Sequence, residues 1–203
     1  MKTELFRIII LSGKKQSGKS SASFRLANDH SFAQIAYADQ LKEFSVQLLH
    51  QMDCVVSYEH FEKEELKNEF IYDIEGKKFL FTTKNRNSVP MTYRQFIQRV
   101  GTEAIRDNIH DGVWIIPVKK FIREAFTNPS QRYRGVVISD ARFLNEIEDI
   151  KKYCKVFGDR AEVTTVEIIR PNVKHTDQHS SETSLKNYKF DIGLLIEGDI
   201  LFI

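Results

Sequence analysis

A glycine-rich segment that directly follows an apolar run constrains the fold of this chain most. The apolar run covers residues 6–11 and predicts a buried strand. The segment after it consists of Gly13, Lys14, Lys15, Gln16, Ser17, Gly18, Lys19 and Ser20. This order fits the pattern G-x-x-x-x-G-K-[ST], in which a turn with two conformationally free glycines leads into a helix. Backbone N–H groups and the positive helix end then point at one anion, so we expect a nucleoside triphosphate site rather than a surface turn.

The predicted roles in this loop follow from the chemistry of a triphosphate. Lys19 is expected between the β- and γ-phosphates, and Ser20 is expected to hold Mg²⁺. The predicted ATP-binding residues are Gly13, Lys14, Gln16, Ser17, Gly18, Lys19, Ser20 and Ser21.

The composition is that of an ordinary globular protein. The chain has 203 residues, of which 41% are hydrophobic and 29% are charged, enough for one substantial core. A net charge of +2 gives no general electrostatic reason to bind nucleic acid or an anionic membrane. Cys54 and Cys154 stand alone, and no apolar stretch approaches the ~20 residues of a membrane span. We therefore expect a cytoplasmic protein without disulfides or a thiolate zinc site.

Apolar, β-branched runs alternate with helical patterns along the chain. Strands are predicted at residues 6–11, 32–36, 136–138, 163–169 and 192–196. Helices are predicted at residues 19–28, 39–52, 92–108 and 112–125, and after Arg142. The helix from Asp39 has an apolar stripe at Leu41, Phe44, Leu48, Leu49 and Met52. This alternation predicts a single α/β domain with a mainly parallel sheet covered by helices on both faces.

Residues 53–90 break this alternation and are predicted to be an insertion. The segment is rich in charged and aromatic residues, with a helical piece near residues 58–68. A hairpin is predicted in which residues 70–72 and 79–81 flank a turn at Glu75-Gly76. A mobile cover over the substrates and a solvated surface excursion are both compatible with this pattern.

The predicted helix at residues 92–108 has a polar side. Thr92 is expected to cap its start. Residues at steps of four form a polar stripe, which consists of Arg94, Gln98, Thr102 and Arg106. Gly101 lies beside the stripe, where a missing side chain leaves room for a ligand. A ligand-binding face and a solvated face both explain the stripe.

Polar residues that follow parallel strands meet at one edge of the sheet, where ligands bind. Asp39 and Lys42 follow the second predicted strand. Asp140 and Arg142 follow the strand at residues 136–138. We therefore expect these side chains to converge on one site.

Two of these residues have competing interpretations. Asp140 is expected to assist Ser20 in holding Mg²⁺ or to bind the acceptor, and the alternative is a helix cap. Arg142 is expected to neutralise charge on the transferred phosphoryl group, and the alternative is a surface ion pair with Glu146.

Further short motifs accompany the loop over most of the chain. They are Leu11-Ser12-Gly13 through Ser20; Ala38-Asp39-Gln40-Leu41-Lys42; Tyr93-Arg94-Gln95 through Gln98; Val100-Gly101-Thr102-Glu103; Trp114; Ile138-Ser139-Asp140-Ala141-Arg142 with Glu146; Ile169-Arg170-Pro171; and His179-Ser180-Ser181-Glu182. In this order they resemble the bacteriophage-type deoxynucleoside monophosphate kinases of the P-loop kinase superfamily. The patterns R-x-x-x-Q-x-x-G-T-[ED] and D-x-R are more specific to this family than the loop is. Residues 53–90 match no motif of the family.

The resemblance implies transfer of the ATP γ-phosphoryl group to a deoxynucleoside monophosphate, with Mg²⁺, in the cytoplasm of a phage host. It implies a three-layer P-loop kinase fold with a five-stranded, mainly parallel sheet and an inserted lid and acceptor-binding region. The implied catalytic residues are Lys19, Arg94, Asp140 and Arg142. The implied acceptor-binding residues are Asp39, Leu41, Lys42, Arg94, Gly101, Thr102, Trp114, Asp140 and Arg142, and the implied metal-binding residues are Ser20 and Asp140.

Two other functions and the oligomeric state stay open at this stage. A P-loop kinase that acts on dephospho-coenzyme A or on a polynucleotide 5′ end has the same loop. A nucleotide-binding module without catalysis has it as well. No stable binding to nucleic acid is expected, and a homodimer is compatible with the sequence.

Overall fold

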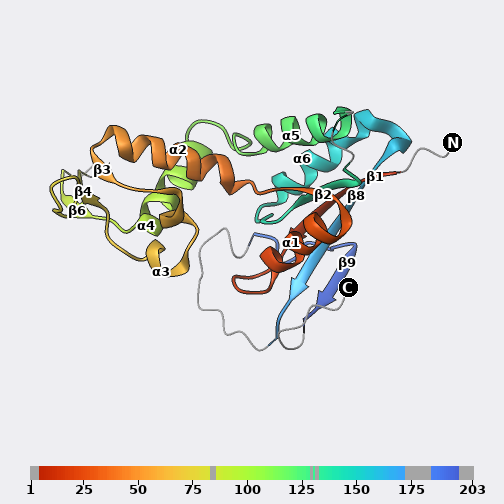
Figure 1. Ribbon diagram of the computed structural model, residues 1–203, viewed down its shortest axis with the longest axis horizontal. Coiled ribbons are helices and arrows are strands. Elements are labelled where there is room, and N and C mark those ends of the chain that lie inside the picture. Colours follow the sequence, from red (N-terminus) through yellow and green to blue (C-terminus); the bar gives the residue numbers. More distant parts are fainter. Residues whose placement is uncertain (1–4, 83–85, 129, 131–132, 172–183, 197–203) are drawn as a thin grey trace. The chain divides into compact units, whose positions relative to one another are not determined.

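The computed structural model describes residues 5–82, 86–128, 130, 133–171 and 184–196 (Figure 1). The motif at residues 179–182 lies outside the described residues. The chain divides into two compact units. We call residues 1–37 and 115–203 the sheet unit, and residues 38–114 the middle unit. No helix among the described residues is long and apolar enough to cross a membrane.

The sheet unit is built on five parallel strands, as the sequence predicts. The strands are β1 (Phe6–Ser12), β2 (Phe32–Ile35), β7 (Gly135–Ile138), β8 (Ala161–Ile169) and β9 (Ile192–Leu195). Their spatial order is β2-β7-β1-β8-β9. The central strand β1 pairs with β8 over its whole length and with β7 over residues 7–10. Its continuous apolar run fits this position, because a central strand of a covered sheet is buried on both faces.

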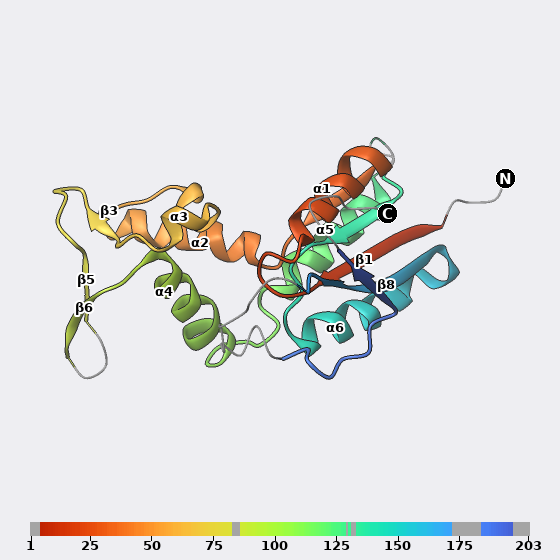
Figure 2. The ribbon, with the colours of Figure 1, turned by 90° about the horizontal axis from the view of Figure 1, so that it is seen from below.

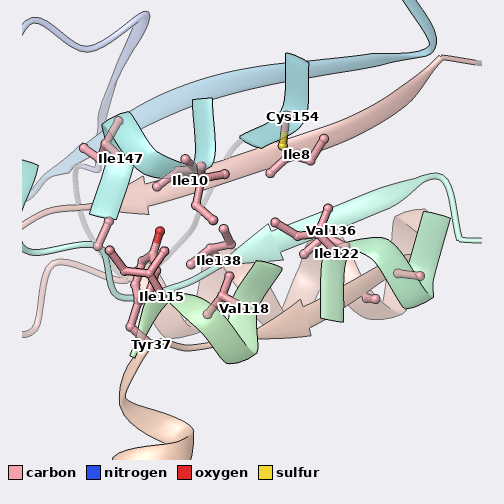
Figure 3. Close-up of a cluster of buried hydrophobic side chains, with 14 of the residues drawn as sticks. Ile8, Ile10, Tyr37, Ile115, Val118, Ile122, Val136, Ile138, Ile147 and Cys154 are labelled. Carbon is pink, nitrogen blue, oxygen red and sulfur yellow. The ribbon is translucent and has the colours of Figure 1, made fainter. Parts of the chain in front are cut away.

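Helices cover both faces of this sheet and give three layers. They are α1 (Lys19–His30), α5 (Ile115–Thr127), α6 (Leu144–Cys154) and the short η3 (Lys155–Arg160). On one face, Ile10 and Ile138 pack with Val118 of α5 and Ile147 of α6 (Figure 3). On the other face, Ala22 of α1 belongs to a cluster of buried side chains that also contains Val137 of β7 and Ile168 of β8. The structure therefore has the α/β architecture that the alternation of strands and helices predicts.

The middle unit has a hydrophobic core of its own. Its elements are α2 (Ala38–Gln51), β3 (Cys54–Val55), η1 (Tyr58–Phe61), α3 (Glu64–Lys67), β4 (Tyr72–Asp73), β5 (Leu80–Thr82), β6 (Ser88–Pro90), α4 (Tyr93–Gln98) and η2 (Arg99–Arg106). The helices α2 and α3 both contact α4, and Figure 2 shows these three helices together. The core residues are Leu49, Cys54, Val56, Phe61, Ile71, Tyr93 and Phe96. The predicted insertion at residues 53–90 lies within this unit, and the single-domain organisation stays a prediction.

The apolar stripe predicted for α2 is only partly correct. Leu49 is fully buried, but Phe44 is 41% exposed. Ser45 is also fully buried, so the inner face of α2 passes through Ser45 and Leu49, one helical turn apart. The prediction chose Phe44 because it is apolar, but the geometry of the helix assigns that place to its small polar neighbour.

The hairpin predicted around Glu75-Gly76 forms its turn, but the pairing beyond the turn is short. Gly76 has a φ of 78°, and its N–H donates to Asp73 O. The strands pair elsewhere, because β4 pairs with β3 and β5 pairs with β6. Across the turn itself, an isolated bridge joins Tyr72 and Lys78, Asp73 N donates to Lys77 O at 2.9 Å, and Phe79 N donates to Ile71 O at 2.8 Å.

The helix predicted at residues 92–108 changes its winding partway. Thr92 caps α4 as predicted, because its hydroxyl accepts a hydrogen bond from Gln95 N. From Arg99 on the helix is a π-helix, with Asp107 N donating to Thr102 O, five residues back. A wider turn shifts later residues around the axis, so the predicted steps of four do not hold beyond Gln98. The next helix, α5, begins at Ile115 rather than at residue 112.

Candidate functional site

The glycine-rich loop leaves the carboxyl end of β1 in a conformation that requires its glycines. Gly13 has a φ of 145° and Gly18 a φ of 102°, and Gly18 is the N-cap of α1. A Cβ on Gly13 would lie 2.4 Å from Ile168 O and 2.8 Å from Ser17 Oγ. The loop therefore combines positive φ values with a close approach to the backbone of β8.

Two side chains in the loop are arranged as a phosphate site needs. Lys19 Nζ donates hydrogen bonds of 2.6 Å to Gly13 O and to Lys14 O. Its ammonium group therefore lies over the loop. Ser17 Oγ is buried and has no hydrogen-bond partner within the described residues. A buried hydroxyl without a partner is costly unless a ligand completes it, so the loop fits a bound phosphate.

Ser20 and Ser21 lie in the first turn of α1 and are exposed. Ser20 is one residue after Lys19, where a hydroxyl can reach a cation on the bound phosphates. Ser20 O accepts a 3.0 Å hydrogen bond from Ser23 Oγ. This bond uses only the backbone of Ser20, so its hydroxyl keeps its predicted role as a magnesium ligand.

Asp140 lies at the same edge of the sheet as the loop. Its Oδ1 accepts a 2.7 Å hydrogen bond from Tyr37 N, which ties the segment after β7 to the segment after β2. The next residue, Ala141, is bonded to β1 through Leu11 O and Ser12 Oγ. Asp140 does not cap α6, because the N-cap of that helix is Phe143. The alternative of a helix cap is therefore wrong, and the carboxylate is held beside the carboxyl ends of three strands.

Glu146 is a structural residue that the sequence analysis misplaced on the surface. It is only 4% exposed, and its Oε2 accepts hydrogen bonds from Arg142 N at 2.8 Å and Phe143 N at 3.0 Å. The predicted surface position of Glu146 is therefore wrong, because this carboxylate is buried and caps the N-terminal end of α6. Tyr37 Oη donates to Glu146 O at 3.0 Å. Burial, with the nearby charges of Glu146 and Asp140, raises the pKa of Tyr37 well above its ordinary value.

In the middle unit, Asp39 and Lys42 lie together at the start of α2, as predicted. Lys42 Nζ lies 3.4 Å from Asp39 Oδ1 and forms an ion pair with Glu62. It also lies 5.6 Å from the centre of the Tyr58 ring, and Tyr58 Oη donates to Asp39 Oδ1. Burial lowers the pKa of Lys42, but the hydrogen bond and charge of Glu62 and the charge of Asp39 outweigh it, so the pKa is raised. Lys42 therefore stays protonated.

Arg94 and Lys67 complete a group of basic side chains in this unit. Arg94 Nη2 forms an ion pair with Glu64, and Arg94 Nε donates to Asn68 Oδ1 at 3.1 Å. Lys67 is half-buried, and its ammonium has no hydrogen bond or ion pair within the described residues. Burial lowers the pKa of Lys67, and the charges of Lys42 and Arg94 lower it further against the opposing glutamates. We call Lys42, Lys67 and Arg94 the cation group.

Neither Lys67 nor the two glutamates of these ion pairs belong to a motif that predicts a role for them. Glu62 and Glu64 lie twenty or more positions from Lys42 and Arg94 in the chain. No motif spacing reveals such pairs. The charged character of residues 58–68 is the only signal that the sequence offers.

Leu41, Gly101 and Trp114 form a second cluster in the middle unit. A Cβ on Gly101 would lie 2.3 Å from Leu41 Cδ2, so the side chain of Leu41 takes the space that the sequence analysis left for a ligand. Trp114 Nε1 donates to Gly101 O at 3.1 Å. Thr102 follows within the π-helix η2. Substrate contacts of these residues stay predictions.

The order of the parallel strands, with a glycine-rich loop after the central one, defines an α/β fold of the P-loop kinase type. The family model for deoxynucleotide monophosphate kinases matches residues 44–201. The chain therefore belongs to the deoxynucleotide monophosphate kinase family. A "Putative deoxynucleotide monophosphate kinase" of Acanthamoeba polyphaga mimivirus is 28% identical over 197 residues, which cover 93% of this chain and 87% of that protein.

These comparisons confirm the resemblance inferred from the motifs. The matched region includes residues 53–90, for which the sequence analysis found no motif of the family. It also includes Arg94, Asp140 and Arg142. The glycine-rich loop lies before residue 44, so its assignment as a phosphate site rests on its own geometry.

Proposed function

We propose that this protein transfers the γ-phosphoryl group of ATP to a deoxynucleoside monophosphate and releases a deoxynucleoside diphosphate. Membership of the deoxynucleotide monophosphate kinase family supports a kinase acting on nucleotides. The conformation of the loop at Gly13 and Gly18 is the single observation that carries the choice of a triphosphate as donor. We further propose that the reaction takes place in the cytoplasm, where both nucleotides are available.

The loop residues supply the binding site for ATP in this proposal. Backbone N–H groups at the start of α1 and the hydroxyl of Ser17 would donate to phosphate oxygens. Lys19 would exchange its bonds to Gly13 O and Lys14 O for bonds to the β- and γ-phosphates. This exchange brings a positive charge to the group that is transferred.

Ser20 and Asp140 are the residues that would hold Mg²⁺ with the nucleotide. The hydroxyl of Ser20 is exposed next to Lys19, and the carboxylate of Asp140 is fixed by Tyr37 N at the same sheet edge. Oxygen ligands of these two kinds suit Mg²⁺. When bound, the ion would neutralise charge on the phosphate oxygens.

The residues proposed to bind the acceptor are those that the family resemblance implies. Lys42 and Arg94 would bind the monophosphate, and Lys67 is a further cation of the same group. Leu41, Gly101, Thr102 and Trp114 would contact the sugar or base. Arg142 would stabilise the charge on the transferred group. The acceptor phosphate is already an anion, so positioning and positive charge carry the chemistry and a dedicated general base is not required.

The test is a set of initial rates at fixed ATP and Mg²⁺. The acceptors are dGMP, dTMP, dAMP, dCMP and GMP, with dephospho-coenzyme A and a DNA 5′ hydroxyl end alongside. The proposal predicts turnover with at least one deoxynucleoside monophosphate. Turnover only with one of the last two acceptors would establish a different kinase. ATP binding without turnover on any acceptor would establish a catalytically silent module.

A further inference from the structure

We propose that Glu62 and Glu64 are exchangeable counter-ions of the acceptor site, and that the acceptor's phosphate takes Lys42 and Arg94 over from them. This inference rests on the proposed function, because it concerns the phosphate that the cation group would bind. The two carboxylates neutralise the site before the substrate arrives. Only a ligand with a phosphate group can then displace them, so binding depends on that group.

Two basic side chains of the cation group are each paired with a glutamate. Lys42 on α2 pairs with Glu62, and Arg94 on α4 pairs with Glu64. Both carboxylates come from one short stretch, between the end of η1 and the start of α3. Both basic residues are predicted to bind the acceptor. One segment of the chain therefore occupies two of the cations that the substrate needs.

The exposure of the partners shows which of them can leave. The side chains of Lys42 and Arg94 are 14% and 27% exposed, whereas those of Glu62 and Glu64 are 47% and 43% exposed. The cations lie inside and the carboxylates lie at the surface. A carboxylate that rotates away regains water at little cost, because half of its surface is already hydrated. Lys42 and Arg94 would lose these carboxylates without gaining much solvent.

The backbone that carries the carboxylates is anchored in the hydrophobic core at Phe61. Phe61 is 2% exposed and packs its ring against Tyr93, with ring centres 5.7 Å apart. In contrast, α3 has four residues, and none of them is buried. Release of the two glutamates therefore leaves the core of the middle unit intact, since Phe61 stays in place.

Lys67 makes the exchange favourable for a phosphate in particular. Its ammonium has no ion pair within the described residues, although it lies close enough to Lys42 and Arg94 for their charges to lower its pKa. A phosphate monoester dianion offers three acceptor oxygens and about two charges. It can contact all three cations at once, whereas Glu62 is paired with Lys42 and Glu64 with Arg94. A nucleoside without phosphate cannot replace the carboxylates at all.

The test measures ligand affinity in Glu62→Gln, in Glu64→Gln and in the double variant. Each glutamine keeps the size of the side chain but removes the competing charge. The dissociation constants of dGMP, dTMP, dAMP and dCMP and of the four matching deoxynucleosides are read from the fluorescence of Trp114, the chain's single tryptophan. Glu59→Gln is the matched control, because Glu59 pairs with Lys63 in the same segment but outside the cation group. Thermal unfolding checks that every variant is folded.

We expect each single variant to bind the monophosphate about two- to five-fold more tightly than the wild type, as removal of a partly exposed ion pair predicts. The double variant should bind it more tightly still, and the affinity for nucleosides and the Glu59→Gln control should not change. Weaker or unchanged monophosphate binding in folded variants would overturn the inference. A wild-type protein that binds no monophosphate would overturn the proposed function instead.

Discussion

Gly13 is the single residue at which the geometry of the loop leaves the least freedom. In Gly13→Ala, the new Cβ would lie 2.4 Å from Ile168 O, a backbone atom that cannot move alone. We expect a loss of about 1–3 kcal/mol in the free energy of unfolding, together with the loss of ATP binding. Thermal unfolding and calorimetric titration with ATP measure the two effects.

Gly76→Ala is the control for the backbone part of this effect. Gly76 has a φ of 78°, but a Cβ there would have no neighbour within 4 Å. Gly76→Ala therefore has the same unfavourable positive φ as Gly13→Ala, but its new Cβ meets no neighbouring atom. ATP binding should survive in Gly76→Ala. Equal ATP affinity in Gly13→Ala and the wild type would show that the loop does not bind the nucleotide as described.

Lys19 is the residue whose charge the proposed reaction would need most. Its ammonium lies over the loop, bonded to Gly13 O and Lys14 O, so its removal should leave the fold unchanged. In Lys19→Met we expect kcat to fall by about 10²–10³-fold, because a fixed positive charge near the transferred group is lost. Lys15→Met removes a neighbouring lysine from an exposed, variable position of the loop and should change kcat little. Similar rates for the two variants would argue against the role given to Lys19.

At the scale of single elements, Thr92 fixes where α4 begins. Its hydroxyl accepts from Gln95 N at 3.2 Å, and Gln95 Oε1 accepts from Thr92 N at 3.0 Å. Thr92→Ala should lower the free energy of unfolding by about 1 kcal/mol, measured by urea denaturation. Thr127→Ala, at the last residue of α5, removes a hydroxyl that bonds only within its own helix. An equal loss in both variants would mean that the cap contributes nothing particular.

Asp191 joins β9 to β8 and makes this contact sensitive to acid. Its Oδ2 accepts hydrogen bonds from Thr165 Oγ1 at 2.6 Å and from Thr165 N at 2.8 Å. These bonds lower the pKa of Asp191 below its ordinary value. The stabilisation is therefore complete above the ordinary carboxyl pKa of about 4 and is lost as the pH falls through the lower folded value.

The matching experiment compares Asp191→Asn with the wild type over pH. At neutral pH we expect the variant to unfold about 1 kcal/mol more easily, because a half-exposed carboxylate contributes less than a buried one. The difference should shrink between about pH 5 and pH 2 as the wild-type carboxyl becomes protonated. A difference that stays constant over this range would contradict the lowered pKa.

The elements that could be predicted from sequence are those whose signal is local. The strands β1 and β7 read as apolar runs, interrupted in β1 by the exposed Arg7, because both of their faces are covered. The pairing of β4 with β3 depends on packing between distant residues, so the turn signal at Gly76 could not predict it. The π-helix η2 has no composition that distinguishes it from an α-helix.

The candidate site also contains residues with a local sequence signal and residues without one. The loop, Asp140 and Arg142 could be predicted because each belongs to a short motif after a strand. The support of Asp140 by Tyr37 could not, since it uses a backbone N–H that every residue but proline possesses. The partners of Lys42 and Arg94 depend on how residues 58–67 fold against α2 and α4. Only the three-dimensional structure reveals them.

At the scale of the whole molecule, the fold and the family support one account of what the protein does. The sheet unit holds the loop, Asp140 and Arg142, and the middle unit holds the cation group with Leu41, Gly101 and Trp114. The family match covers residues 44–201, which include almost all of the middle unit. The central claim is the proposed transfer of a phosphoryl group between two nucleotides.

³¹P nuclear magnetic resonance tests this claim most directly, because it follows the phosphoryl group itself. The protein is mixed with ATP, Mg²⁺ and the deoxynucleoside monophosphate that binds most tightly. The account predicts that the γ-phosphate signal of ATP falls while the β-phosphate signal of the deoxynucleoside diphosphate rises in equal amount. Release of inorganic phosphate alone, or an unchanged spectrum with both nucleotides bound, would contradict it.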